Sequence, residues 1–160
     1  MILLIGTPMF FCGGPIHSVA WCPTPIETST NHVERDQYLA VSAFKEEDRF
    51  RSSTQSSFSS KYVIQIWNCG KLRNQESPTI PPRLELCITH EFGRIWSLVW
   101  CPSGCYNDSR LGLLAAACSD GSVQLFSIPK PNALQLEERY FIIVIITNIT
   151  IAITTQLKCL

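Results

Sequence analysis

The chain has 160 residues, 46% of them hydrophobic, and its 13 basic residues balance its 13 acidic ones. This length suits about one domain, and the apolar content provides for a buried core, which excludes wholesale disorder. A free-standing nucleic-acid-binding protein would carry a basic stripe, so the zero net charge argues against that class.

The chain begins with an apolar stretch. It lacks the basic n-region of a signal peptide, and Pro8 interrupts it. We therefore expect residues 1–9 to be an N-terminal strand or lead-in, with a signal peptide as the alternative.

One short text then occurs twice. Residues 13–23 read GGPIHSVAWCP, and residues 92–102 read FGRIWSLVWCP. Aligned, the two copies share six identical pairs: Gly14 and Gly93, Ile16 and Ile95, Ser18 and Ser97, Trp21 and Trp100, Cys22 and Cys101, Pro23 and Pro102. Repetition at fixed spacing is the signature of a fold built from repeated units.

The first unit is expected over residues 10–70. A polar loop follows its opening text, and residues 38–44 are predicted to form a strand. Residues 45–61 are charged and then Ser-rich, which predicts a flexible insertion. Residues 62–70 read YVIQIWNCG and are predicted to form another strand. Residues 71–90 are expected to be a linker and a strand.

The second unit is expected over residues 91–129 and has the same order. The runs at 94–100 and 122–128 are short, rich in β-branched and aromatic residues, and bounded by Gly and Pro, which favours strands. The run at 111–119 has helical propensity, and its position before Asp-Gly favours a strand there. Asp120 and Gly121 lie between the last two runs, and this dipeptide is the strongest short signal for a hairpin. The insertion of the first unit therefore stands where the second has only a tight turn.

Residues 130–160 are expected to be a linker and an atypical apolar tail. The tail is β-branched over about the length of a membrane span, yet Asn148 and several Thr dilute it. A weak membrane segment, a pair of buried strands, and sequence foreign to the fold are the three alternatives.

The order of Gly, strand with an aromatic end, Pro turn and Asp-Gly turn resembles a blade of a WD-repeat β-propeller. Trp67 with Asn68, and Phe126 with Ser127, occupy the family's Trp-Asp place, and the family's opening Gly-His pair is missing in both units. The resemblance implies an all-β fold, a partial propeller of about two blades. Such a fragment leaves strand edges unpaired, so we expect it to be stable only within a fuller protein or complex.

A closer resemblance is to the WD-repeat subunits of transcription factor IIIC, over about residues 10–136. Its most specific part is the segment RLGLLAAACSDGSVQLFSIPKPNAL. The resemblance implies a nuclear, non-catalytic scaffold that contacts other subunits of that complex and reaches promoter DNA of RNA polymerase III genes indirectly. It implies no cofactor and no small-molecule substrate.

Ten residues are expected to hold the blades together: Gly14, Trp21, Pro23, Trp67, Gly93, Trp100, Pro102, Asp120, Gly121 and Phe126. The aromatic ones should pack between neighbouring blades, each burial contributing roughly 2–3 kcal/mol. Trp96 aligns with His17 and is less fixed by the repeat, so Trp96 and Arg94 are candidate interface residues. The basic candidates for phosphate contact, or else for a solvated surface, are Arg83, Arg94, Arg110 and Lys130.

The sequence shows no catalytic constellation. CGGP lacks the Lys-Ser/Thr of a phosphate loop, and no G-x-S-x-G motif occurs. His17 and His90 have no nucleophile and orienting acid beside them, so we expect each to be a loop or strand-edge residue. The eight Cys include no CxxC pair and the three His no ligand spacing, which predicts no metal site. Buried or unpaired thiols are favoured, with disulfides as the alternative.

Two other functions fit parts of the sequence. One is a WD-repeat adaptor of a different complex. The other is a membrane-anchored or secreted Cys-containing protein, which would use the apolar ends and the sequon that begins at Asn148.

Overall fold

The computed structural model describes residues 9–23, 36–43, 62–71, 81–103, 105–133 and 145–147. The elements within these ranges are almost all strands. In chain order they are β1 (Ile16–Trp21), β2 (Asp36–Ala43), β3 (Tyr62–Lys71), β4 (Arg83–His90), β5 (Ile95–Trp100), β6 (Arg110–Cys118), β7 (Val123–Pro129), a 3₁₀ helix η2 (Pro131–Ala133) and β8 (Ile145–Thr147).

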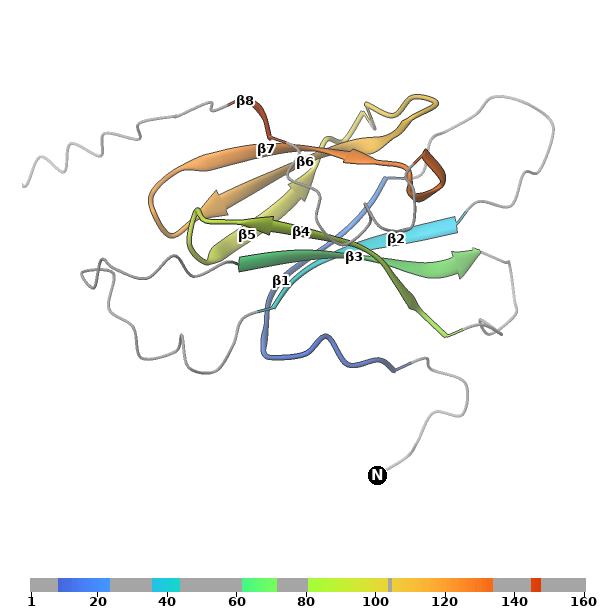
Figure 1. Ribbon diagram of the computed structural model, residues 1–160, viewed down its shortest axis with the longest axis horizontal. Helices are drawn as coiled ribbons and strands as arrows, with labels where there is room; N and C mark the ends of the chain where they lie inside the picture. Colours follow the sequence, from blue (N-terminus) through green and yellow to red (C-terminus); the bar gives the residue numbers. More distant parts are fainter. Residues whose placement is uncertain are drawn as a thin grey trace, which may run out of the picture.

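The strands form two antiparallel sheets, with the orders β1-β2-β3-β4 and β5-β6-β7-β8 (Figure 1). The all-β class expected from the sequence is therefore confirmed. The strand expected within residues 71–90 is β4, and it pairs with β3. The first sheet thus extends to His90, beyond the limit of 70 that we gave to the first unit.

The apolar run at 111–119 carries helix-forming Leu and Ala, yet it is strand β6. Every second residue along it is buried, from Gly112 through Leu114 and Ala116 to Cys118. This period of two fits a strand that is paired on both sides, here with β5 and β7. Pairing and burial therefore outweigh the helical propensity of the alanines.

Each sheet begins with the repeated text, and the repetition extends to backbone irregularities. The pairing of β1 with β2 shifts between Ile16 and Ser18, and that of β5 with β6 shifts between Ile95 and Ser97. These are aligned positions of the two copies, and such a shift marks a β-bulge. Both units therefore share their strand order and this local bend.

The two sheets pack face to face over one apolar core. Its members come from both sheets: Cys22, Ala40, Ile64, Ile66, Leu86 and Ile88 from the first sheet and the residue after β1, and Ile95, Leu98, Trp100, Leu114, Ala116, Cys118, Phe126 and Ile128 from the second. A smaller cluster of Cys12, Val41 and Trp67 lies on the other face of the first sheet. Packing between the sheets is thus the main source of stability.

The insertion expected at residues 45–61 lies outside the described residues, but its place in the topology is defined. In the first sheet the chain leaves β2 at Ala43 and enters β3 at Tyr62. In the second sheet a short turn that contains Asp120 and Gly121 joins β6 to β7. The connection between β2 and β3 therefore stands at the place where the second sheet has its hairpin turn.

Residues 1–8 and most of the tail after 133 also lie outside the described residues, apart from the short strand β8. Residues 9–15 form no strand and precede β1. We call this described segment the lead-in below, although the sequence placed the lead-in at residues 1–9. Among the described residues, no helix has the length and apolar character needed to cross a membrane.

Candidate interaction surface

The first strands of the two sheets, β1 and β5, are joined by side-chain hydrogen bonds. The backbone N–H of Leu98 donates to Ser18 Oγ at 2.9 Å, and Trp100 Nε1 donates to the carbonyl of Ala20 at 3.0 Å. The rings of His17 and Trp96 meet edge to face, with centroids 4.8 Å apart. The donors thus lie on the second sheet and the acceptors on the first, which fixes how the sheets are staggered.

Equivalent residues form a row across each sheet. In the second sheet Trp100 pairs with Leu114, which pairs with Phe126, and all three are buried in the core between the sheets. In the first sheet the corresponding row is Trp21, Leu39 and Trp67.

The two rows have different surroundings. Trp100 is 4% exposed because the first sheet covers it, whereas Trp21 is 59% exposed. We expected both to pack between blades, and for Trp21 the described part of the chain supplies no such packing. Ile16 and Val19 are exposed like Trp21, while their counterparts Ile95 and Leu98 are buried. In the first sheet, therefore, these positions of β1 are uncovered, whereas the equivalent positions of β5 are buried.

The lead-in covers part of this face. The ring of Phe10 lies 4.4 Å from that of Trp67, centroid to centroid. Gln65 Nε2 donates to the carbonyl of Cys12 at 2.9 Å, and Trp67 Nε1 donates to Gln65 Oε1 at 2.8 Å. Trp67 is thus packed against the lead-in, whereas we expected it to pack between neighbouring blades.

Each sheet has a second face. In the first sheet this face packs against the second sheet, and in the second sheet the equivalent face points away from the first. Ala40 and Ile66 are fully buried between the sheets. The equivalents of Ala20, Ala40 and Ile66 are Val99, Ala115 and Leu125. Val99 is 56% exposed, and Ala115 and Leu125 are half-buried. Each sheet thus has one apolar face that its neighbour covers and one that it leaves open.

Asp120 and Gly121 form the tight turn that the sequence predicts. Gly121 has a φ of 86°, a left-handed value that favours glycine, and its N–H donates to the carbonyl of Cys118 at 3.1 Å. Asp120 Oδ1 accepts from the N–H and the hydroxyl of Ser122 at 2.9 and 2.7 Å. The aspartate therefore stabilises the turn locally.

Gly93 joins this turn to the start of β5. Its φ is 79°, and a Cβ at this position would collide with Ser119 Oγ. The N–H of Arg94 donates to that same oxygen at 2.9 Å, and the N–H of Ser119 donates to the carbonyl of Arg94 at 2.8 Å. In the first unit the left-handed residue is Gly13, not the aligned Gly14.

The remaining sequence candidates lie at the strand ends. Pro23 and Pro102 each follow a cysteine whose N–H is bonded to the adjacent strand, Cys22 to the carbonyl of Tyr38 and Cys101 to that of Leu113. Trp96 is 53% exposed on β5 and is available for an interface.

His90 is a residue that sequence reasoning missed. It ends β4, an edge strand, which agrees with the expected strand-edge position, but its side chain is buried, with 5% of its surface exposed. Its ring stacks near Tyr62 and Phe92, at centroid distances of 6.0 and 5.9 Å. Neither ring nitrogen has a hydrogen-bond partner within the described residues. Burial lowers the pKa of His90 to about 4, which the charge of Asp120 opposes. The ring is therefore neutral and serves as packing.

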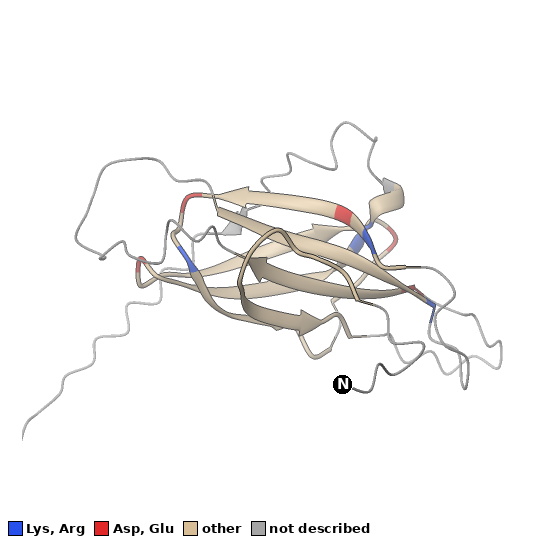
Figure 2. Cartoon of the chain, turned by 90° about the horizontal axis from the view of Figure 1, so that it is seen from below, with Lys and Arg blue, Asp and Glu red and all other residues tan. Residues whose placement is uncertain are grey.

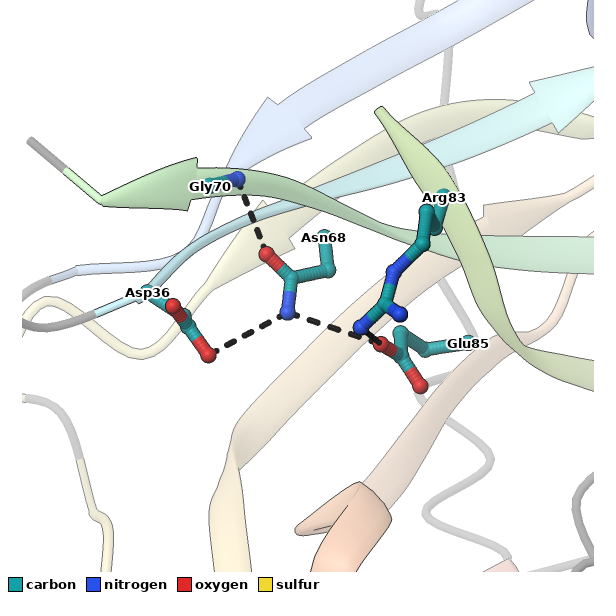
Figure 3. Close-up of polar contacts among 5 residues, drawn as sticks. All are labelled: Asp36, Asn68, Gly70, Arg83 and Glu85. Carbon is teal, nitrogen blue, oxygen red and sulfur yellow. Dashed lines mark hydrogen bonds and ion pairs between the residues drawn. The ribbon is translucent and has the colours of Figure 1, made fainter. Parts of the chain in front are cut away.

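Asn68 stands in the family's Trp-Asp place and links three segments (Figure 3). Its Nδ2 donates to Asp36 Oδ2 at 3.2 Å and to Glu85 Oε1 at 3.5 Å, while its Oδ1 accepts from the N–H of Gly70 at 2.8 Å. Glu85 also pairs with Arg83 at 3.0 Å. An amide suits this site because it donates to two carboxylates, which an aspartate could not do.

Charged side chains are few on the described part of the chain. Figure 2 shows them scattered over turns and strand ends, without a basic stripe. Arg83 is paired with Glu85, and Arg110 Nε donates to the carbonyl of Cys105 at 2.7 Å. The described residues also contain no group of three His, Cys, Asp or Glu that could hold a metal ion. Among the described residues, the open apolar sheet faces are the candidate interaction surface.

The fold and this surface define a class: an all-β chain of two stacked antiparallel sheets, each with an open apolar face. No protein-family model matches the chain. It is 35% identical over 140 residues to General transcription factor 3C polypeptide 2 of Homo sapiens, and equally to that of Pongo abelii, across 81% of this chain. It is 34% identical over 121 residues, 74% of this chain, to Transcription factor tau subunit sfc6 of Schizosaccharomyces pombe.

The chain spans only 15% of the length of the first two relatives and 18% of the third. Their names agree with the resemblance to transcription factor IIIC found in residues 10–136. The names do not mention WD repeats or a propeller, which stay predictions.

Proposed function

We propose that this chain is a non-catalytic scaffold segment of a transcription factor IIIC subunit. In this role it contacts other subunits in the nucleus and supports promoter recognition and the assembly of RNA polymerase III for initiation. The observation that carries the proposal is the 35% identity to General transcription factor 3C polypeptide 2 over 81% of the chain. Promoter DNA would be reached through the complex, because the described surface has no basic stripe for direct binding.

We further propose that the two sheets are neighbouring blades of a WD-repeat propeller. A propeller blade is a four-stranded antiparallel sheet, and adjacent blades stack around an axis lined by their first strands. The shared strand order, the shared bulge and the contact of β1 with β5 support this arrangement.

The open faces then receive further sheets. A preceding sheet would cover Ile16, Val19 and Trp21, as the first sheet covers their counterparts in β5. A following sheet would cover the face that carries Val99 and would donate to Ser97 as Leu98 donates to Ser18. Burying such apolar faces provides the driving force, at about 25 cal/mol per Å².

Affinity purification of the tagged chain from nuclear extract, followed by mass spectrometry, tests the proposed function. Co-purification of other transcription factor IIIC subunits is expected. Recovery of chaperones alone, from a chain that melts cooperatively when purified, would contradict the scaffold role. Recovery of a different complete complex would favour an adaptor of another pathway.

A pair of variants sharpens this experiment. Trp96→Ala removes a half-exposed aromatic side chain of β5 and should lower the recovery of partner subunits, with only a small drop in melting temperature from the lost His17 contact. Tyr106→Ala is the matched control, since Tyr106 is an exposed aromatic residue in the loop that follows β5. Equal recovery for both variants and the unchanged chain would remove Trp96 from the interface.

A further inference from the structure

The loop between β5 and β6 brings two thiols together. Cys101 Sγ lies 3.1 Å from Cys105 Sγ and 3.2 Å from Ser103 Oγ. Neither cysteine is buried, and both are free thiols. Two sulfur atoms this close need little movement to form a covalent bond.

The backbone of both cysteines is anchored to β6. The N–H of Cys101 donates to the carbonyl of Leu113 at 2.9 Å, and the carbonyl of Cys105 accepts from Arg110 Nε at 2.7 Å. Cys105 has a φ of 48°, a left-handed value that is uncommon outside glycine and that turns the chain back. The anchored backbone thus holds the two thiols together before any reaction.

The aligned cysteine of the first unit provides an internal contrast. Cys22 is buried in the core, and its Sγ lies near two backbone carbonyls, 3.8 Å from that of Pro23 and 4.0 Å from that of Leu111. Burial raises the pKa of Cys22 to about 12, which keeps it an unreactive thiol. The hydrogen bonds from Ser103 and Cys105 instead lower the pKa of Cys101. One repeat position therefore holds an inert thiol in the first unit and a thiolate-prone one in the second.

We propose that Cys101 and Cys105 form a peroxide-sensitive thiol pair that closes into a disulfide. The thiolate of Cys101 attacks one oxygen of hydrogen peroxide, the O–O bond breaks, and the released hydroxide takes up a proton to become water. The sulfur of Cys105 then attacks the resulting sulfenic acid and the S–O bond breaks. Hydroxide leaves and takes the proton of Cys105 as a second water. The two thiols are oxidised and one peroxide is reduced.

The test uses the whole chain, treated with hydrogen peroxide, alkylated with N-ethylmaleimide and digested with trypsin. Cleavage after Arg94 and Arg110 releases one peptide, residues 95–110, that contains both cysteines. After peroxide this peptide is expected to be lighter by two hydrogen atoms and free of alkylation, and dithiothreitol should restore both thiols. Closure should be about tenfold faster, or more, in the native chain than in urea, because the fold positions the thiols in advance.

Two variants separate this pair from the other thiols. Cys105→Ser should leave the sulfenic acid of Cys101 without a resolving thiol, so dimedone should label Cys101. Cys22→Ser should not change closure at all. Alkylation of both thiols in the peptide after peroxide, equal closure rates with and without urea, or linkage of Cys101 to another cysteine would each overturn the proposal.

Discussion

The buried neutral His90 makes the fold less stable at acidic pH. Its pKa is lowered from 6.5 to about 4 by burial, so the fold favours the uncharged ring. The stabilisation is therefore present above about pH 6.5, is lost progressively as the pH falls from 6.5 to about 4, and falls no further once the folded state is also protonated. Protonation would place a charge among Tyr62, Phe92 and Phe126, whose rings surround it.

The size of the effect follows from the two pKa values. Moving from 6.5 to about 4 corresponds to about 3 kcal/mol once protonation is complete. About 2 kcal/mol of this falls between about pH 7 and about pH 5. His90→Phe keeps an aromatic ring in the stack and removes both unpartnered nitrogens. This variant should therefore be at least as stable as the unchanged chain at neutral pH and should lose much less stability in acid.

Urea unfolding of both proteins at about pH 7 and about pH 5, followed by Trp fluorescence, measures this difference. Tyr62→Phe is the control, because it alters a neighbouring ring but keeps the histidine, and it should retain the acid sensitivity. If His90→Phe loses as much stability as the unchanged chain between these two pH values, the reasoning from its burial is wrong.

Two further predictions concern hydrogen bonds that other residues make. Trp100→Phe removes the donor to the carbonyl of Ala20 and should lower the free energy of unfolding by about 1 kcal/mol, measured by urea denaturation. Asn68→Asp restores the residue type of the family's Trp-Asp pair but sets a third carboxylate beside Asp36 and Glu85 and removes the amide donor. It should destabilise the fold by about 1–3 kcal/mol at neutral pH, and less in acid, measured in the same way.

Each of these variants has a matched control. Trp21→Phe makes the same chemical change as Trp100→Phe at an exposed position and should alter stability by less than about 0.5 kcal/mol. Asn132→Asp makes the same change as Asn68→Asp at an exposed residue and should be close to neutral. If Trp21→Phe lowered the free energy of unfolding as much as Trp100→Phe, the role of the Ala20 contact would be contradicted. If Asn68→Asp stabilised the fold, the role of the Asn68 amide as a donor to Asp36 and Glu85 (Figure 3) would be wrong.

The repeated text predicted most of the fold because each copy carries its own strand and turn signals. Alternation along 122–128 identified β7, the pair of Asp120 and Gly121 identified β6 despite its helical propensity, and the alignment identified β1 and β5 as equivalent strands. β4 was expected as a strand, but its membership of the first sheet depends on pairing with β3, which residue patterns along one segment do not encode.

The surface was harder to predict than the fold. An aligned tryptophan is either buried or exposed according to whether another sheet lies on it, so the sequence could not distinguish Trp21 from Trp100. The burial of His90 was missed because two of the rings that cover it, Phe92 and Phe126, are far apart in the sequence. Phe92 precedes β5, whereas Phe126 lies in β7, after β6. The proximity of Cys101 and Cys105 depends on the left-handed backbone at Cys105, for which a non-glycine residue gives no signal.

The placement of donors on one sheet and acceptors on the other gives the stack a direction. The second sheet brings Leu98 and Trp100 as donors to a first sheet that offers Ser18 and Ala20. The repeat places the aligned donor positions, Val19 and Trp21, on the open face of the first sheet and the aligned acceptor position Ser97 on the second. Interfaces of this head-to-tail kind propagate in one sense, unlike the self-complementary contacts of a twofold dimer. The two hydrogen bonds therefore set the sense in which sheets stack, donor face against acceptor face, and a unit inserted backwards would have to bury its donors unpaired.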